Sequence, residues 1–127
     1  MNISERLDVM RQAEPGCNLV AFGDLGTRLV LRSSAATQQP QEYLDQLCAQ
    51  AEQGFGLQDL LGSQEEPHQT NEVLVITPRE TRIFVRSSVT GDTADNDAIL
   101  CVCNDEQTAQ SLIQPAKAVL DDLLGPA

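Results

Sequence analysis

The chain has 127 residues, with 19 acidic against 8 lysine or arginine side chains and a formal net charge of −11 at pH 7. This length is enough for a hydrophobic core, and we expect residues 1–127 to form a single domain. So acidic a chain repels phosphate backbones and anionic lipid, which argues against nucleic-acid partners and leaves a basic protein partner compatible with the charge.

The first third predicts a helix and a β-hairpin. Ile3–Ala13 has apolar residues at helical spacing, with Asn2 or Ser4 available as N-cap and Pro15-Gly16 after its end. Two alternating runs, 19–22 and 27–32, flank a glycine-containing turn and predict paired strands. In the second run, strict alternation places one set of side chains on one face (Leu29, Leu31 and Ser33) and the other set on the opposite face (Arg28, Val30 and Arg32).

The middle of the chain predicts a long amphipathic helix. It begins near Pro40, whose missing N–H costs nothing in a first helical turn, and ends before Gly62. Its apolar residues recur at helical spacing and form one stripe: Tyr43, Leu44, Leu47, Cys48, Ala51 and Phe55.

The last part predicts three strands and a helix. The strands are expected at 72–77, Thr81–Arg86 and 98–103. The helix is expected over 104–124, with Asn104 as N-cap; its apolar stripe keeps its phase across Pro115, which indicates one kinked helix. The predicted order is therefore α-β-β-α-β-β-β-α.

The strand at 72–77 does not alternate, because Val73, Leu74, Val75 and Ile76 are consecutive apolar residues. Such a strand is either internal and covered on both faces, or an edge strand that invites pairing with another chain. Pairing with its own copy about a two-fold axis would cover the edge and give a homodimer.

The longest apolar run, at 98–103, has six residues, far fewer than the about 20 of a membrane-spanning helix. Residues 1–10 include Glu5 and Asp8 and do not resemble a secretory signal. We therefore expect a cytoplasmic protein without membrane insertion. Its four cysteines are then expected to be reduced thiols (Cys17, Cys48, Cys101 and Cys103).

Cys101 and Cys103 lie two residues apart on a strand, so their side chains share a face. A zinc site would need two further ligands and usually has its cysteines in a loop, so buried core thiols are the favoured interpretation. His68 lies in a polar loop with nothing to orient its ring. We predict no catalytic, metal or cofactor-binding residue, no cofactor, and no enzymatic activity.

Five of the eight basic residues lie on or beside predicted strands: Arg28, Arg32, Arg79, Arg82 and Arg86. Spacing of four within two of the strands would place each pair on one face, where the arginines would form a basic patch. Ordinary outward-facing strand residues are the favoured interpretation.

Nearly the whole chain resembles the Roadblock family, which includes a dynein-associated light chain and a bacterial gliding-motility GTPase-activating partner. The resemblance depends on the first helix, the hairpin LVAFGDLGTRLVL with its Asp24-Leu25-Gly26 turn, the helix after Pro40, the meander and the C-terminal helix. It implies an α+β, profilin-like sandwich with a five-stranded antiparallel sheet in the order 2-1-5-4-3. The first and last helices would lie on one face and the second helix on the other.

The resemblance also implies function. Such proteins dimerise through the third strand and the second helix, and they bind or regulate small Ras-like GTPases or act as scaffolds in signalling or motility assemblies. The implied dimer interface in this chain comprises Val73, Leu74, Val75 and Ile76 with the exposed flank of the second helix at Tyr43, Leu44, Leu47 and Ala51. The implied strand order separates strands two and four by about 14 Å, which weakens the idea of one basic patch.

Two alternatives belong to other classes. A type III secretion chaperone is also acidic, dimeric and of similar length, but its order resembles α-β-β-β-α-β-β-α, with three strands before the middle helix. A thiol or metal enzyme would use Cys101 and Cys103, and metal analysis of the purified protein tests that hypothesis.

Overall fold

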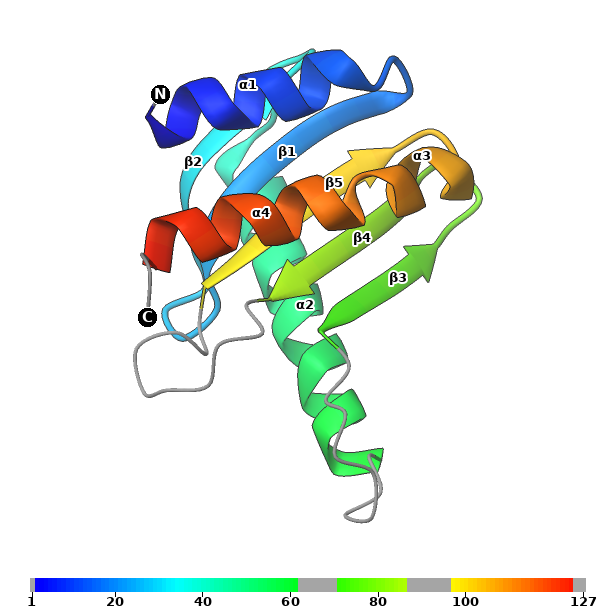
Figure 1. Cartoon of the computed structure of the whole chain (residues 1–127). Helices are drawn as coiled ribbons and strands as arrows, with labels where there is room; N and C mark the ends of the chain where they lie inside the picture. The colour runs from blue at the N-terminus through cyan, green and yellow to red at the C-terminus, as the bar shows by residue number, and fades with distance from the viewer. Residues whose placement is uncertain (1, 62–70, 87–96, 125–127) are drawn as a thin grey trace.

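The computed structural model describes residues 2–61, 71–86 and 97–124 (Figure 1). The elements are α1 (Ile3–Ala13), β1 (Cys17–Asp24), β2 (Leu29–Ala35), α2 (Gln41–Leu61), β3 (Glu72–Ile76), β4 (Thr81–Arg86), β5 (Asp97–Cys103), α3 (Glu106–Ser111) and α4 (Ile113–Leu124). This is the order expected from the sequence, except that the last helix is divided in two.

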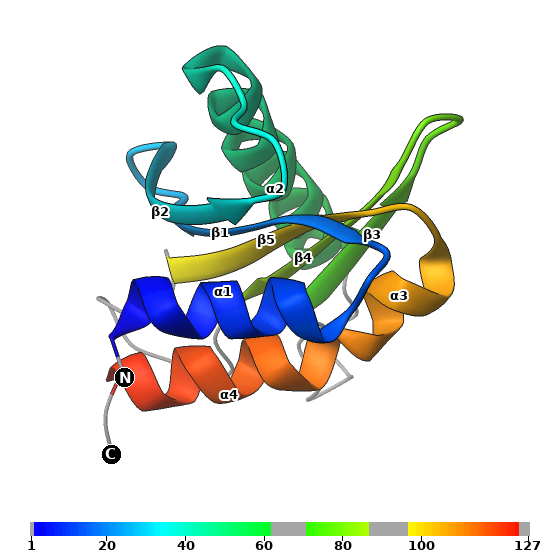
Figure 2. The ribbon, with the colours of Figure 1, turned by 90° about the horizontal axis from the view of Figure 1, so that it is seen from above.

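The strands form one antiparallel sheet in the order β2-β1-β5-β4-β3. One layer of helices, α1 with α3 and α4, covers one face, and α2 crosses the other (Figure 2). The predicted fold class, strand order and arrangement of layers are confirmed.

Two hydrophobic cores lie on the two faces of the sheet, and the central strand β5 contributes to both. Ile99, Cys101 and Cys103 pack toward α1, α3 and α4, whereas Ala98, Leu100 and Val102 pack toward α2. This is the two-residue period of a strand applied to a fully apolar run. Burial of each large aliphatic side chain contributes about 1.5–3 kcal/mol, which lets a core with few aromatic residues hold the layers together.

The helix α1 has the predicted bounds and cap. The Asn2 side chain accepts a hydrogen bond from the Glu5 backbone N–H at 2.9 Å, which satisfies one of the free donors of the first turn. Leu7 and Met10 are buried against the sheet. The apolar face therefore positions the helix on the sheet, and the local cap determines where the helix begins.

The hairpin of β1 and β2 contains a bulge that the sequence did not predict. Phe22 is opposite Arg32 but Gly23 is opposite Val30, so Leu31 is an extra residue on β2. The bulge reverses the alternation, and the expectation that Val30 and Arg32 share a face is wrong. Val30 packs toward α2, whereas Leu29 and Leu31 are exposed.

The C-terminal helix is interrupted at Leu112, between α3 and α4. Pro115 has no N–H for the Ser111 carbonyl and its ring crowds that carbonyl, so the helix breaks one turn before the proline. The apolar stripe continues in phase, since Ala109, Leu112 and Ala116 lie in one core cluster, and α3 and α4 together take the place of the single kinked helix that the sequence predicted. The N-cap is Asp105, which accepts from Thr108 N–H at 2.8 Å, and not Asn104.

Candidate functional site

The strand β3 lies at one edge of the sheet and pairs with β4 alone among the described strands (Figure 1). Leu74 and Ile76 are 37% and 62% exposed, whereas Val73 and Val75 pack partly against the core under α2. The sequence left an internal and an edge position open, and the edge position is confirmed. The strand presents both apolar side chains and free backbone groups along one margin of the molecule.

Three of the residues expected on the exposed flank of α2 are buried in the core of this chain. Leu44, Leu47 and Ala51 are 9%, 0% and 0% exposed, so the expectation that they offer surface to a second copy is wrong. The physical reason is that the apolar stripe of α2 is the face that packs on its own sheet. Tyr43 is half-buried beside this stripe. Participation of Tyr43 and of Val73 to Ile76 in a dimer stays a prediction.

The flank of α2 that faces β3 carries a different set of residues. A Cβ on Gly54 would lie 2.8 Å from Val73 Cγ1, and the Gln58 side chain donates to the Glu72 carbonyl at 2.9 Å. Helical spacing of three and four from Gly54 places Leu57 and Leu61 on the same flank. These leucines are 55% and 74% exposed, near the end of α2 that projects past the strands (Figure 1).

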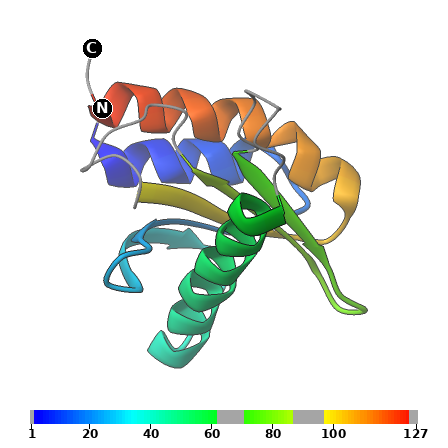
Figure 3. The same cartoon turned by 90° about the horizontal axis from the view of Figure 1, so that it is seen from below.

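Sequence reasoning missed these two leucines, although a signal was present. The apolar spacing of the buried stripe ends at Phe55, and leucines beyond it fall outside the stripe. We call the exposed apolar residues at this margin the edge surface. It comprises Leu57 and Leu61 on α2 and, on β3, Leu74 and Ile76, which alternate with the α2-facing valines and so point to the other face of the sheet. Figure 3 shows α2 crossing the sheet with the hairpin of β3 and β4 beside it.

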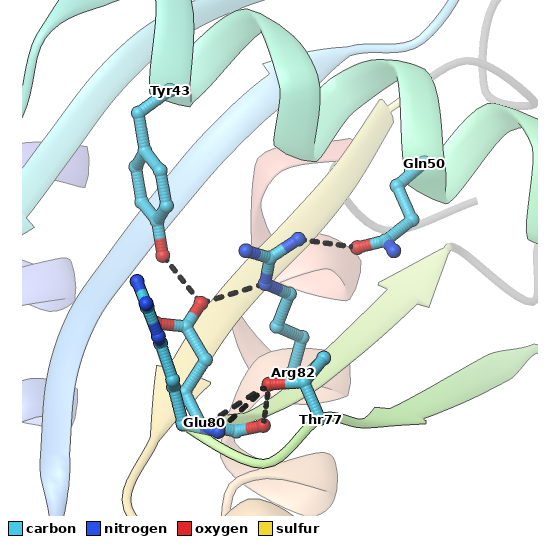
Figure 4. Close-up of polar contacts among 6 residues, drawn as sticks. Tyr43, Gln50, Thr77, Glu80 and Arg82 are labelled. Carbon is cyan, nitrogen blue, oxygen red and sulfur yellow. Dashed lines mark hydrogen bonds and ion pairs between the residues drawn. The ribbon is translucent and has the colours of Figure 1, made fainter.

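A polar network fixes the hairpin of β3 and β4 against α2 (Figure 4). Tyr43 Oη donates to Glu80 Oε2 at 2.6 Å, and Arg82 Nε donates to the same oxygen at 2.7 Å. Arg82 also donates to Gln50 Oε1 at 2.8 Å, and its guanidinium carbon lies 5.5 Å from the centre of the Tyr43 ring. The Thr77 hydroxyl donates to the Glu80 carbonyl at 2.8 Å and closes the turn.

The ionisation of this network follows from its surroundings. Burial, together with the hydrogen bond to Glu80, raises the pKa of Tyr43 to about 12. Burial alone would raise the pKa of Glu80, but hydrogen bonds from Tyr43 and Arg82 outweigh it and lower that pKa. At neutral pH the network therefore consists of a carboxylate, a guanidinium and a neutral phenol that donates.

Two further arginines attach the rest of α2. Arg28, in the turn before β2, forms a two-pronged ion pair with Glu52, with distances of 2.7 and 2.9 Å. Arg86, at the end of β4, pairs with Asp59 at 2.7 and 3.1 Å and lies 4.7 Å from the centre of the Phe55 ring. These arginines bind acidic residues of α2, so their charge serves the attachment of the helix and not a basic patch.

The four cysteines are free and buried, as expected for core residues. Within residues 2–61, 71–86 and 97–124, no three His, Cys, Asp or Glu side chains are arranged to hold a metal ion. His68 lies outside the described residues. In the same described ranges, no helix has both the length and the apolar character needed to cross a bilayer.

No protein-family model and no curated protein matches the sequence. Solved structures match the fold over nearly the whole chain. The Roadblock/LC7 domain from Streptomyces avermitilis has a TM-score of 0.70 at 12% identity, covering 98% of this chain and 96% of its own. MglB from Myxococcus xanthus has a TM-score of 0.71 at 11% identity, covering 96% of this chain and 94% of its own. MglC from the same organism has a TM-score of 0.63 at 10% identity, covering 94% of this chain and 98% of its own. At such identities the likeness shows a shared fold.

Proposed function

We propose that this chain, which has the fold of the Roadblock family, is a non-enzymatic module that forms a homodimer and binds other proteins. The observation that carries this proposal is the edge surface: Leu74 and Ile76 are exposed on the edge strand β3, and Leu57 and Leu61 are exposed on α2, which covers the other face of the sheet. Large apolar side chains that are exposed at the edge of a sheet mark an interaction site on a soluble protein.

The fold favours a second copy as the first occupant of this surface. Two β3 strands that run antiparallel about a two-fold axis would complete each other's hydrogen bonds and extend the sheet from five to ten strands. A five-residue strand is only about 17 Å long, so strand pairing alone buries little area. The same two-fold axis brings the flanks of the two α2 helices together, and their leucines supply the remaining contact that a dimer of roughly 1,600 Å² needs.

The partner that we propose for the dimer is a small Ras-like GTPase, bound as a regulator or held in a cytoplasmic scaffold for signalling or motility. Support comes from the family resemblance and from similar folds in a gliding protein, MglB of Thermus thermophilus, and in an MglB with a tetrameric arrangement. The chain would act by contact and supply no catalytic group. The secretion-chaperone alternative receives no support, since two strands precede α2 and three follow it.

Light scattering of the purified chain tests the dimer. The expected mass is twice the 13.8 kDa of one chain at micromolar concentration. Ile76→Arg and Leu61→Arg place a charge in the edge surface and should give monomers with an unchanged helical spectrum. Val9→Arg is the matched control, because Val9 is 53% exposed on α1, which packs over β1 and β2 at the other edge of the sheet. A wild-type monomer would overturn the proposal, as would dissociation by Val9→Arg alone.

Affinity capture tests the GTPase. Immobilised wild-type chain is exposed to lysate of the native host supplemented with GDP or with a non-hydrolysable GTP analogue, and bound proteins are identified by mass spectrometry. The expected result is a small Ras-like GTPase whose recovery depends on the nucleotide and falls with Ile76→Arg. Recovery of no GTPase in either nucleotide state contradicts this part of the proposal and leaves the dimer intact.

A further inference from the structure

We propose that Cys17 and Cys103 form an oxidisable dithiol, which closes to a cross-strand disulfide when the protein meets a peroxide. The two residues are the first of β1 and the last of β5. They lie in the core beneath α1, α3 and α4, on the opposite face from α2. The proposal is therefore independent of the edge surface and of the function proposed for it.

The register of the sheet brings the two cysteines face to face. Cys17 and Cys103 are direct partners in the antiparallel pairing of β1 with β5. Such partners have Cα atoms about 4.5 or 5.5 Å apart, within the range of roughly 4.4–6.8 Å that a disulfide requires. Both side chains belong to the same core cluster, so they point to the same side of the sheet. A bond between them needs rotation of side chains and no new backbone path.

The other two cysteines are not placed in this way. Cys101 is opposite Val20 and Ile83 in the sheet, and Cys48 lies on α2 at the other face. Burial raises the pKa of Cys48 to about 11, which keeps it a thiol at neutral pH. Among the four cysteines of the chain, the register therefore selects one pair.

The surroundings of Cys17 favour its thiolate, the form that reacts. Interaction with the Cys103 side chain is the largest influence and lowers the pKa of Cys17, and the positive charge of Arg11 acts in the same direction. The pKa of Cys103 is raised, chiefly by Cys17 and then by burial. The pair thus divides into one sulfur that gives up its proton more easily and one that retains it.

Both cysteines are buried, but they lie at the ends of their strands, next to the turns that join α1 to β1 and β5 to α3 (Figure 1). Asn18, which follows Cys17 in β1, and Asn104, which follows β5, are exposed and joined by a hydrogen bond of 2.8 Å between their side chains. Opening this end requires fraying of a strand terminus and not unfolding of the core. Hydrogen peroxide is small enough to reach the sulfur atoms through such an opening.

The chemistry balances in two steps. The Cys17 thiolate attacks one oxygen of hydrogen peroxide, the O–O bond breaks, and the products are a sulfenic acid and hydroxide. The Cys103 sulfur then attacks the Cys17 sulfur, an S–S bond forms, and water leaves with the proton that Cys103 gives up. The two thiols together lose two electrons, and the peroxide is reduced to two molecules of water.

The test is alkylation of the full-length chain with N-ethylmaleimide under denaturing conditions, before and after treatment with hydrogen peroxide. Four thiols should react before treatment and two after it, with a mass loss of about two hydrogens. Peptide mapping should find Cys17 joined to Cys103, with Cys48 and Cys101 alkylated. The oxidised chain should melt at a temperature several degrees higher, because the bond constrains the unfolded state.

Cys17→Ser and Cys103→Ala should each abolish the two-thiol loss, and Cys48→Ala, the matched control, should retain it. Circular dichroism verifies that each variant is folded. The proposal is overturned if the wild-type chain still alkylates at four positions, if the bond involves Cys101, or if only disulfides between two chains form. If no bond forms between Cys17 and Cys103, the dimer at β3 is unaffected, because its mass is measured separately.

Discussion

Gly54 of α2 lies against Val73 of β3 so closely that a side-chain carbon on Gly54 would fall 2.8 Å from Val73 Cγ1. Valine is stiff at χ1 and cannot turn its methyl groups away, so the space between α2 and the edge strand is set by this glycine. The residue at position 54 therefore determines how closely α2 approaches the edge strand.

Gly54→Ala should destabilise the fold although alanine is the better helix former. Overpacking costs about 1–3 kcal/mol and exceeds the roughly 1 kcal/mol gained from helix propensity. Urea unfolding followed by circular dichroism measures the change. Gly56→Ala is the matched control, since nothing lies within 4 Å of a Cβ at Gly56, and it should stabilise the chain by about 0.5–1 kcal/mol. Equal effects of the two substitutions would show that Gly54 has no packing role.

Glu80→Gln tests the network that joins the hairpin to α2. The amide keeps the shape of the carboxylate but leaves the guanidinium of Arg82, only 18% exposed, without its counter-charge. The expected loss of unfolding free energy is about 1–2 kcal/mol, with an unchanged dependence on urea concentration. Asp121→Asn, at an exposed position of α4, should change stability by less than about 0.5 kcal/mol. A comparable loss in that control would mean that net charge, and not the network, is responsible.

Tyr43 gives the fold a dependence on alkaline pH. Its pKa is about 12 in the folded chain and about 10 in the unfolded one, so the folded state retains the phenol proton more strongly. The stabilisation is complete below pH 10 and is lost as the pH rises from about 10 through about 12. Tyr43→Phe cannot titrate, so the stability difference between wild type and variant should be constant from pH 7 to about 9 and shrink above about 10. Urea unfolding along that pH series is the measurement, and a constant difference up to pH 11.5 would contradict this role.

Arg28 has a backbone φ of 58°, in the left-handed region that favours glycine, while its side chain holds Glu52. Arg28→Ala loses the ion pair and keeps the strain, whereas Arg28→Gly loses the pair and relieves the strain. Thermal unfolding should therefore rank Arg28→Gly above Arg28→Ala by several degrees. Both variants lack the ion pair, so the reverse order would show that relief of backbone strain at this position does not stabilise the hairpin.

Features with local causes could be predicted from the sequence. The bounds of α1 follow from an Asn cap, an apolar spacing and a Pro-Gly pair, all within a few residues of one another. The strand order came from the family resemblance, and the apolar run of β3 indicated a strand that needs a cover. The apolar stripe of α2 predicted a buried face. Part of it was expected to contact a second copy, whereas Leu47 and Ala51 are buried in the core of this chain.

Features with distant causes could not be predicted. No local signal marks Leu31 as the extra residue of a bulge, because the bulge is a property of the pairing with β1. The meeting of Tyr43 with Glu80 spans 37 positions and depends on where α2 crosses the sheet. Likewise, Cys17 faces Cys103 only once the register of β1 with β5 is known, whereas the sequence drew attention to Cys101 and Cys103.

The bulge on β2 has a consequence for assembly. If both edge strands of a sheet can pair with another copy, each added copy exposes a new edge strand, and assembly continues into an open-ended fibre. In this chain the margin opposite β3 is bent by the extra Leu31 and carries the exposed charge of Arg32. In the dimer that we propose, pairing through β3 would leave two outer margins of this bent and charged kind, and growth would end at two chains.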